Sequence, residues 1–120
     1  EIIRLALVAP APVNLCGNTS LTQAIDLIAT STVVVCNDSG LMHVAAALGV
    51  QQVAVFGSSS PLHTPPLNAK AHVIWLKSDT TYQPALDCAP CFERDCPLPA
   101  GPLHLRCLND ISPQRVLQFL

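Results

Sequence analysis

Charged residues, aromatic residues and long apolar runs are all scarce in this chain of 120 residues. Charged residues make up 12% of it, the net charge is −2, and no run of lysine or arginine occurs. This scarcity argues against a surface that binds nucleic acid by neutralising phosphates, and aromatic residues, at 4%, are too few to stack bases. No apolar stretch reaches the roughly eighteen residues that cross a bilayer, and no secretory signal pattern is visible. We therefore expect neither a nucleic-acid partner nor a transmembrane segment.

Half of the residues are hydrophobic, which is enough for one domain with its own core. The chain begins at Glu1 without an initiator methionine, in a stretch that has the pattern of a helix. We therefore expect residues 1–120 to be one domain of a longer protein.

Apolar runs alternate with helical patterns along the chain, which is typical of βαβ units around a parallel sheet. We expect an α/β, Rossmann-like fold whose strands are buried on both faces. The expected strands are residues 13–16, 32–36, 52–56 and 72–76, and the expected helices include the end of one at 2–8 and a later one at 41–48. Residues 77–111 are expected to form an irregular region rich in cysteine.

Several helix ends carry their own signals. Ser20 followed by Gln23 matches a capping box, and the apolar stripe of an amphipathic helix follows it. Gly49 suits the left-handed residue that commonly follows a helix. Ser112 and Pro113 are typical of the cap and the first residue of a final helix.

The most informative run extends from Asn37 to Gly49, where a predicted strand ends and a helix begins. Asp38 follows the strand, and Ser39 and Gly40 open the helix. Glycine lets the backbone approach an anion closely, and the serine hydroxyl adds a donor. With the free amides and the positive dipole end of the first helical turn, these residues predict a phosphate or diphosphate site. The pattern does not name the ligand.

Other residues near this run have structural alternatives. The Asp38 carboxylate can orient a ligand or its own loop, but it can equally form an Asx turn or a helix cap. His43 can donate a hydrogen bond to a phosphate, although a single histidine at a helix start is more often structural. Met42 is expected in the core. The loop at residues 57–60 also follows a strand, so we expect it beside Asp38 at the carboxyl edge of the sheet, where the strand order reverses.

Four cysteines lie at spacings close to those of zinc ligands: Cys88, Cys91, Cys96 and Cys107. Without a visible secretory route, reduced thiols or a metal are favoured over disulfides. The loose last spacing and the lack of a glycine after Cys91 weaken the metal interpretation, so a structural zinc site and free thiols remain as alternatives. Four thiolates would leave a zinc ion no open position for catalysis. Cys16 and Cys36 fall in predicted strands and are expected in the core.

The run from Asn37 to Leu48 resembles the donor-site signature of glycosyltransferase family nine, the ADP-heptose:lipopolysaccharide heptosyltransferases. Other stretches are similar to the branch of this family that adds the second heptose. They are Thr19–Leu21, Gly57–Pro61, Thr64–Pro66, Cys88–Pro97 and Ser112–Leu117. The resemblance covers nearly the whole chain, in the family's order.

This resemblance implies a GT-B fold, in which two Rossmann-like domains face each other and the C-terminal one, represented by this chain, binds the nucleotide sugar. It places Asp38, Ser39, Gly40 and His43 against the diphosphate side of ADP-heptose, with His43 stabilising the leaving group, and Thr19 near the adenine. It implies inversion by direct displacement without a bound metal. The catalytic Asp and the lipopolysaccharide-core acceptor would belong to the other domain, so the chain alone is expected to be inactive. The enzyme would act in the cytoplasm, at the inner face of the inner membrane, with peripheral membrane association.

One departure and two alternatives accompany the resemblance. Residues 99–102 look like an insertion that lengthens the spacing before Cys107. A nucleotide-sugar epimerase has a related Asp-Ser-Gly loop but usually continues with Gly and a ribose-binding Glu, where this chain has Leu41 and His43. A non-catalytic interaction module organised by the cysteines is the second alternative. A nicotinamide-binding domain is disfavoured because no Gly-x-Gly-x-x-Gly motif follows the first strand.

Overall fold

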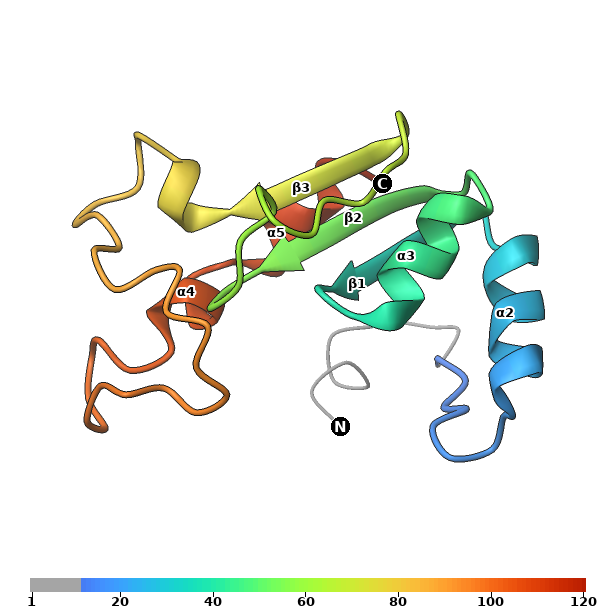
Figure 1. Cartoon of the computed structure of the whole chain (residues 1–120), viewed down its shortest axis with the longest axis horizontal. Helices are drawn as coiled ribbons and strands as arrows, with labels where there is room; N and C mark the ends of the chain where they lie inside the picture. The colour runs from blue at the N-terminus through green and yellow to red at the C-terminus, as the bar shows by residue number, and fades with distance from the viewer. Residues whose placement is uncertain (1–11) are drawn as a thin grey trace.

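The computed structural model describes residues 12–120, which form a parallel three-stranded sheet with helices on its faces (Figure 1). The strands are β1 (Val33–Asn37), β2 (Gln51–Phe56) and β3 (Ala71–Trp75), and they lie side by side in that order. Asn37 pairs with Val55, and Phe56 pairs with Trp75, so all three strands end at one edge of the sheet. The predicted α/β class with a parallel sheet is confirmed, and three of the expected strands occur within one residue of their predicted bounds.

Helix α3 (Gly40–Ala47) covers one face of the sheet, and α2 (Leu21–Thr30) packs against α3 beside the sheet (Figure 1). Met42 of α3 is fully buried and packs with Ala54, Phe56 and Trp75, with half-buried Cys36 against them. A second cluster joins α2 to α3 and is formed by Ile28, Ala45 and Val50. The predicted core role of Met42 is therefore confirmed. Cys36 is also a core-contacting residue, and burial raises the pKa of its thiol.

The end of the chain covers the opposite face, where α5 (Pro113–Leu117) passes behind the sheet in Figure 1. The Gln51 side chain donates to the carbonyl of Phe119 (3.1 Å), and the ring of His72 stacks on the ring of Phe119 with centroids 4.8 Å apart. Ser112 caps α5 by accepting from the Arg115 amide, and Pro113 is its first residue, as predicted.

Between β3 and α5 the chain forms a region of mostly irregular structure, which we call the Cys-rich region (residues 77–111). It begins within the short 3₁₀ helix η1 (Leu76–Ser78) and contains α4 (Arg106–Asn109). A small core joins this region to the start of η1 and consists of Leu76, Leu86 and Ala89, with Tyr82, Cys107 and Ile111 against them. The Arg106 guanidinium ties this region together, because it donates to the Tyr82 hydroxyl (2.7 Å) and to the Pro84 carbonyl (3.0 Å).

Some expectations are wrong. Residues 13–16 form no strand, because the Asn14 side chain accepts from the Cys16 amide (3.0 Å) and Gly17 turns the chain at a φ of +75°. Cys16 is consequently exposed and not in the core. β1, an edge strand of the described sheet, is at most half-buried and not buried on both faces, and its Val35 is 52% exposed. Within residues 12–120 the strand order also shows no reversal. The helix end expected at residues 2–8 lies outside the described residues.

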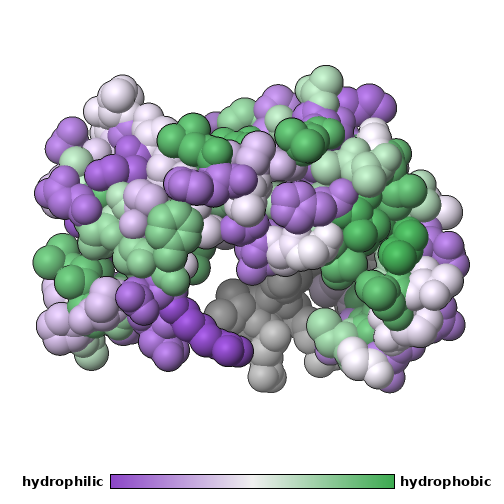
Figure 2. All heavy atoms as spheres, in the orientation of Figure 1, coloured by the Kyte–Doolittle hydropathy of each residue, from purple (hydrophilic) through white to green (hydrophobic). Residues whose placement is uncertain are grey.

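Exposed apolar side chains gather over α2 and α3, on the right of Figure 2. They include Leu21, Leu27, Leu41 and Leu48. None of the helices described between residues 12 and 120 combines the length and the apolar character that a membrane crossing requires.

Candidate functional site

The candidate site lies at the carboxyl edge of the sheet, where two loops leave neighbouring strands. Asp38 and Ser39 follow β1, and Gly57 follows β2. Because β1 and β2 are parallel and paired in register, these loops begin side by side. The prediction that the two loops are neighbours is therefore confirmed. A side-chain hydrogen bond described below links them directly.

The start of α3 is open toward this edge. Ser39 is the N-cap residue, in an extended conformation, but among the described residues its side chain accepts no capping hydrogen bond. A methyl group added at Gly40 would meet no described atom within 4 Å. The Met42 amide donates to the Ser39 carbonyl (3.1 Å), so the Gly40 and Leu41 amides are the ones left at this end of the helix, with the positive end of the helix dipole behind them. This arrangement can accept an anion such as a phosphate.

Asp38 is held by a residue from the other loop. The Thr64 hydroxyl lies 3.2 and 3.3 Å from the two carboxylate oxygens of Asp38 and donates to them. Asp38 is half-buried, and its side chain thereby ties the β1 end to a segment 26 residues further along the chain. Among the roles considered for Asp38, this contact agrees with the one in which its carboxylate orients the loop. The sequence singled out Thr64 only within the stretch Thr64–Pro66 and gave it no role at Asp38, so this contact was missed.

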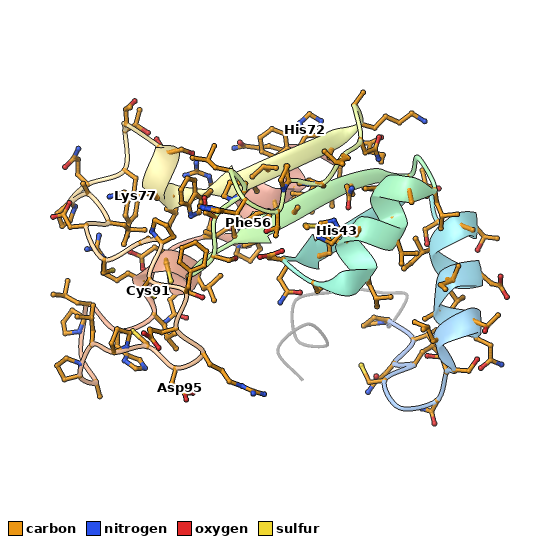
Figure 3. The ribbon with its side chains drawn as sticks, viewed as in Figure 1. His43, Phe56, His72, Lys77, Cys91 and Asp95 are labelled. Atoms are coloured by element: carbon orange, nitrogen blue, oxygen red, sulfur yellow. The ribbon has the colours of Figure 1, made fainter. Side chains whose placement is uncertain are left out.

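His43 is exposed on α3, one turn after Gly40. Figure 3 shows its ring on the surface of the helix. An exposed imidazole at this position is free to donate to a ligand held by the first-turn amides. The structure thus brings Asp38, Ser39, Gly40 and His43 together on one short segment, the strand-to-helix turn.

The serine loop after β2 is more structural than expected. Ser60 is 1% exposed, its hydroxyl accepts from the Leu62 amide (3.2 Å), and its carbonyl accepts from the His63 amide (3.0 Å). Its hydroxyl therefore shapes the turn instead of facing a ligand. A side chain at Gly57 would have to displace Leu108, because a Cβ there would lie 2.7 Å from Cγ of Leu108.

Thr19 stands apart from this group. It precedes the capping box of α2 and borders a shallow cavity of about 360 Å³ together with side chains of α2: Gln23, Asp26, Leu27 and Thr30. Its predicted place near an adenine stays a prediction.

The four clustered cysteines line one mostly apolar cavity of about 90 Å³ in the Cys-rich region. All four are free thiols, and the Leu105 amide donates to Sγ of Cys96 (3.4 Å). Burial raises the pKa of the Cys107 thiol, and the neighbouring thiols Cys88, Cys91 and Cys96 raise it further. Within the described residues, however, no three His, Cys, Asp or Glu side chains are placed where they could share a metal ion. The thiols converge on a cavity without forming a ligand set as they stand.

Comparisons with known proteins agree on one family. The family model of "Glycosyltransferase family 9 (heptosyltransferase)" matches residues 2–100. The lipopolysaccharide heptosyltransferase 2 of Escherichia coli is 46% identical over 107 residues, which cover 89% of this chain and 27% of that protein. The lipooligosaccharide heptosyltransferase 2 of Haemophilus influenzae is 56% identical over 64 residues, covering 53% of this chain and 18% of that protein.

A solved structure gives the same answer. The chain superposes on E. coli ADP-heptose lps heptosyltransferase II with a TM-score of 0.62 and 44% identity, covering 88% of this chain and 25% of that one. The chain thus spans about a quarter of the length of these full relatives. Because the family model and the fold agree over most of its length, the chain belongs to glycosyltransferase family 9, the heptosyltransferase family.

Proposed function

We propose that this chain is the donor-binding domain of an inverting heptosyltransferase that transfers heptose from ADP-L-glycero-D-manno-heptose to the lipopolysaccharide inner core. The observation that carries the proposal is the open N-terminus of α3 in a chain of this family. Ser39 leaves the first-turn amides without a side-chain cap among the described residues, and Gly40 leaves space above them. These are the requirements of a site for the diphosphate of a nucleotide sugar.

The proposed chemistry uses this end of α3 to stabilise the leaving group. During displacement, negative charge grows on the diphosphate as its bond to the sugar breaks. The first-turn amides and the helix dipole are fixed in position before the reaction, so they stabilise this charge without reorganising. His43, exposed one turn along the same helix, adds a side-chain donor beside them. No metal ion is needed for this stabilisation.

Asp38 has a different proposed role. A carboxylate beside a diphosphate would repel it, so Asp38 is unsuited to direct phosphate contact. Its bond with Thr64 instead fixes the two loops of the site, and its remaining acceptor capacity suits hydroxyl groups of the sugar. Thr19 is proposed to lie near the adenine.

The remainder of the proposed enzyme lies outside this chain. The catalytic base and the site of the lipopolysaccharide-core acceptor are assigned to a second Rossmann-like domain that faces the carboxyl edge of the sheet across a GT-B cleft. The exposed leucines over α2 and α3 suit a surface that other parts of an enzyme cover. We place the enzyme in the cytoplasm, in peripheral contact with the inner membrane that carries its acceptor.

Titration calorimetry with ADP and with UDP tests the donor assignment on the 120-residue chain. We expect weak binding of ADP, weaker binding of UDP, and no heptose transfer by the chain alone. Circular dichroism of the same sample shows whether it is folded. Tighter binding of UDP, or no binding of either nucleotide by a folded sample, would contradict the proposal.

The two alternatives are less well supported. An epimerase disagrees with the family match and with Leu41 and His43 in the site loop. An interaction module built on a structural zinc would need the four thiols of the cysteine cavity to move into a common ligand set. Metal analysis of the purified protein separates these cases, because a structural site predicts one zinc per chain and unfolding on chelation.

A further inference from the structure

We propose that Phe92, in the Cys-rich region, is a positioning residue that holds the Ser58–Thr64 loop and, through Thr64, the Asp38 carboxylate. The inference rests on the proposed function and deepens it. It gives the Cys-rich region a role at the donor site without placing any cysteine in contact with the donor. Three consecutive contacts support it.

The first contact joins the Cys-rich region to the beginning of the loop. The Phe92 amide donates to the Ser58 carbonyl at 2.8 Å, which is a well-formed bond between segments 34 residues apart. Close packing accompanies it nearby, where Leu108 fills the space that a side chain at position 57 would need. The start of the loop is thus fixed against the Cys-rich region on two sides.

The second contact is made by the Phe92 ring. Its edge meets the ring of His63, with centroids 5.4 Å apart and planes at 87°. This is the favoured T-shaped arrangement of two rings. His63 belongs to the turn in which the amides of His63 and Thr64 both donate to the Ser60 carbonyl.

The third contact joins the His63 turn to Asp38 of the candidate site. Thr64 adjoins His63 in the chain, and its hydroxyl donates to both carboxylate oxygens of Asp38. A shift of the His63 turn would therefore move the partner of Asp38. The contacts run from Phe92 to the His63 turn, then to Thr64 and to Asp38.

The backbone of Phe92 is strained. Its φ is +57°, in the left-handed region that residues other than glycine rarely adopt. Such strain persists where surrounding contacts determine the conformation, and it often marks functional positions. The ring is 58% exposed, so core packing does not account for this conformation. The bond to Ser58 and the ring contact with His63 are both made in this conformation.

The first test removes the ring and keeps the backbone. Phe92→Asn retains the amide donor and tolerates a positive φ, and because the Phe92 ring is exposed the replacement leaves the core intact. We expect hydrogen exchange of the His63 and Thr64 amides to accelerate about two- to tenfold, the range set by the worth of an aromatic pair. In the complete enzyme we expect the donor KM to rise by a similar factor, with kcat changed less. Phe92→Tyr should restore both.

Two controls make the test specific. Leu103→Ala removes a similarly exposed apolar side chain of the Cys-rich region and should change neither measurement. Thr64→Val removes the hydroxyl and keeps the shape. It should raise the donor KM, and the combination with Phe92→Asn should raise it by less than the product of the two single effects. Multiplicative effects would show that Phe92 and Thr64 act independently and would overturn the inference.

The exchange measurement separates this inference from the proposed function. Unchanged exchange at His63 and Thr64 in Phe92→Asn, or equal acceleration in Leu103→Ala, would overturn the positioning role even if ADP binds. Failure of the unaltered protein to bind ADP would count against the donor site instead, and exchange would still decide whether Phe92 holds the loop.

Discussion

Helices α2 and α3 both have a serine at the N-cap position, yet the two serines differ in the hydrogen bonds that they make to the first turn. Ser20 forms a full capping box, because its hydroxyl accepts from the Gln23 amide (3.2 Å) and its own amide donates to the Gln23 side chain (2.8 Å). Ser39 has no such partner among the described residues. The start of α2 is closed by side chains of the chain itself, whereas the start of α3 has no side-chain cap among the described residues.

A single position accounts for much of this difference. Three residues after Ser20 stands Gln23, whose side chain can reach back to the cap. Three residues after Ser39 stands Met42, which has no hydrogen-bonding group suited to this and is fully buried under the sheet. The residue that anchors α3 to the core thus occupies the position from which a capping box would be closed.

The largest effect in this comparison is expected from His43, which adds a side-chain donor to the open end of α3. In the complete enzyme, His43→Ala should lower kcat about ten- to a hundredfold, since a donor to developing charge contributes on this scale. Donor binding should weaken less than turnover, because the charge grows in the transition state. Steady-state kinetics measure both.

The matched control for His43 is His72→Ala. His72 is also exposed, but it lies on β3 and stacks on Phe119 at the opposite face of the sheet. Its replacement should leave kcat unchanged. Equal turnover of the His43→Ala and unaltered enzymes would remove His43 from the proposed mechanism.

Gly40 and Gly49, at the two ends of α3, should respond in opposite ways to alanine. A methyl at Gly40 meets no described atom, so stability should hold, while ADP affinity should fall about tenfold because the methyl blocks close approach of the phosphate. Gly49 has a φ of +68°, so Gly49→Ala should cost about 1 kcal/mol of stability and leave ADP affinity unchanged. Thermal unfolding and calorimetry together check the pair. Unchanged ADP affinity in Gly40→Ala would argue that no phosphate group of ADP binds close to Gly40.

The regular elements were largely predictable from local sequence signals. The capping box at Ser20, the left-handed Gly49 and the Ser112–Pro113 helix start each depend on residues a few positions apart, and each occurs in the structure. The wrong strand at residues 13–16 shows the limit of apolar patterns. There the Asn14 side chain competes for the backbone and forms a turn.

The site was predictable only where it is contiguous in the chain. Asp38, Ser39, Gly40 and His43 lie on one strand-to-helix turn, so the sequence pattern found them together. Thr64 and Phe92 approach the site through tertiary contacts over 26 and 34 residues, and no local pattern encodes those distances. The spacing of the cysteines left a structural zinc site and free thiols as alternatives, because a shared ion depends on how the side chains are placed and not on their spacing alone.

Replacing the two cap serines tests the comparison directly. Ser20→Ala should lower stability by about 1 kcal/mol, the usual cost of losing a cap, and should leave ADP binding unchanged. Ser39→Ala should cost little stability, since among the described residues its side chain accepts no capping hydrogen bond, but it should weaken ADP binding severalfold. Chemical denaturation and calorimetry measure the two quantities. Equal loss of stability in both variants would show that Ser39 caps α3 in solution.

The smallest effect is expected at α5, a third serine-capped helix, which an ion pair also ties to the rest of the fold. The Arg115 guanidinium lies 2.6 Å from the Asp79 carboxylate, and the Thr81 hydroxyl lies 2.6 Å from its other oxygen. The Thr81 bonds and Arg115 lower the pKa of Asp79 from 3.8 to about 2. Because the pKa is lowered in the folded state, this contribution is complete above about pH 4 and is lost as the pH falls toward 2.

Hydrogen exchange between about pH 4 and pH 2 tests this contact, after correction for the intrinsic pH dependence of exchange. Acid should loosen α5 more than α2, because the capping box of α2 contains no titrating group. Asp79→Asn should loosen α5 already at neutral pH and abolish its extra acid sensitivity, whereas Asp26→Asn, on exposed α2 surface, should do neither. If α2 and α5 loosened in parallel in the unaltered protein, the acid effect would be global and the Asp79–Arg115 pair would not be its cause. The response of hydrogen exchange to acid thus distinguishes α2, whose cap is made by uncharged side chains, from α5, which also depends on an ion pair.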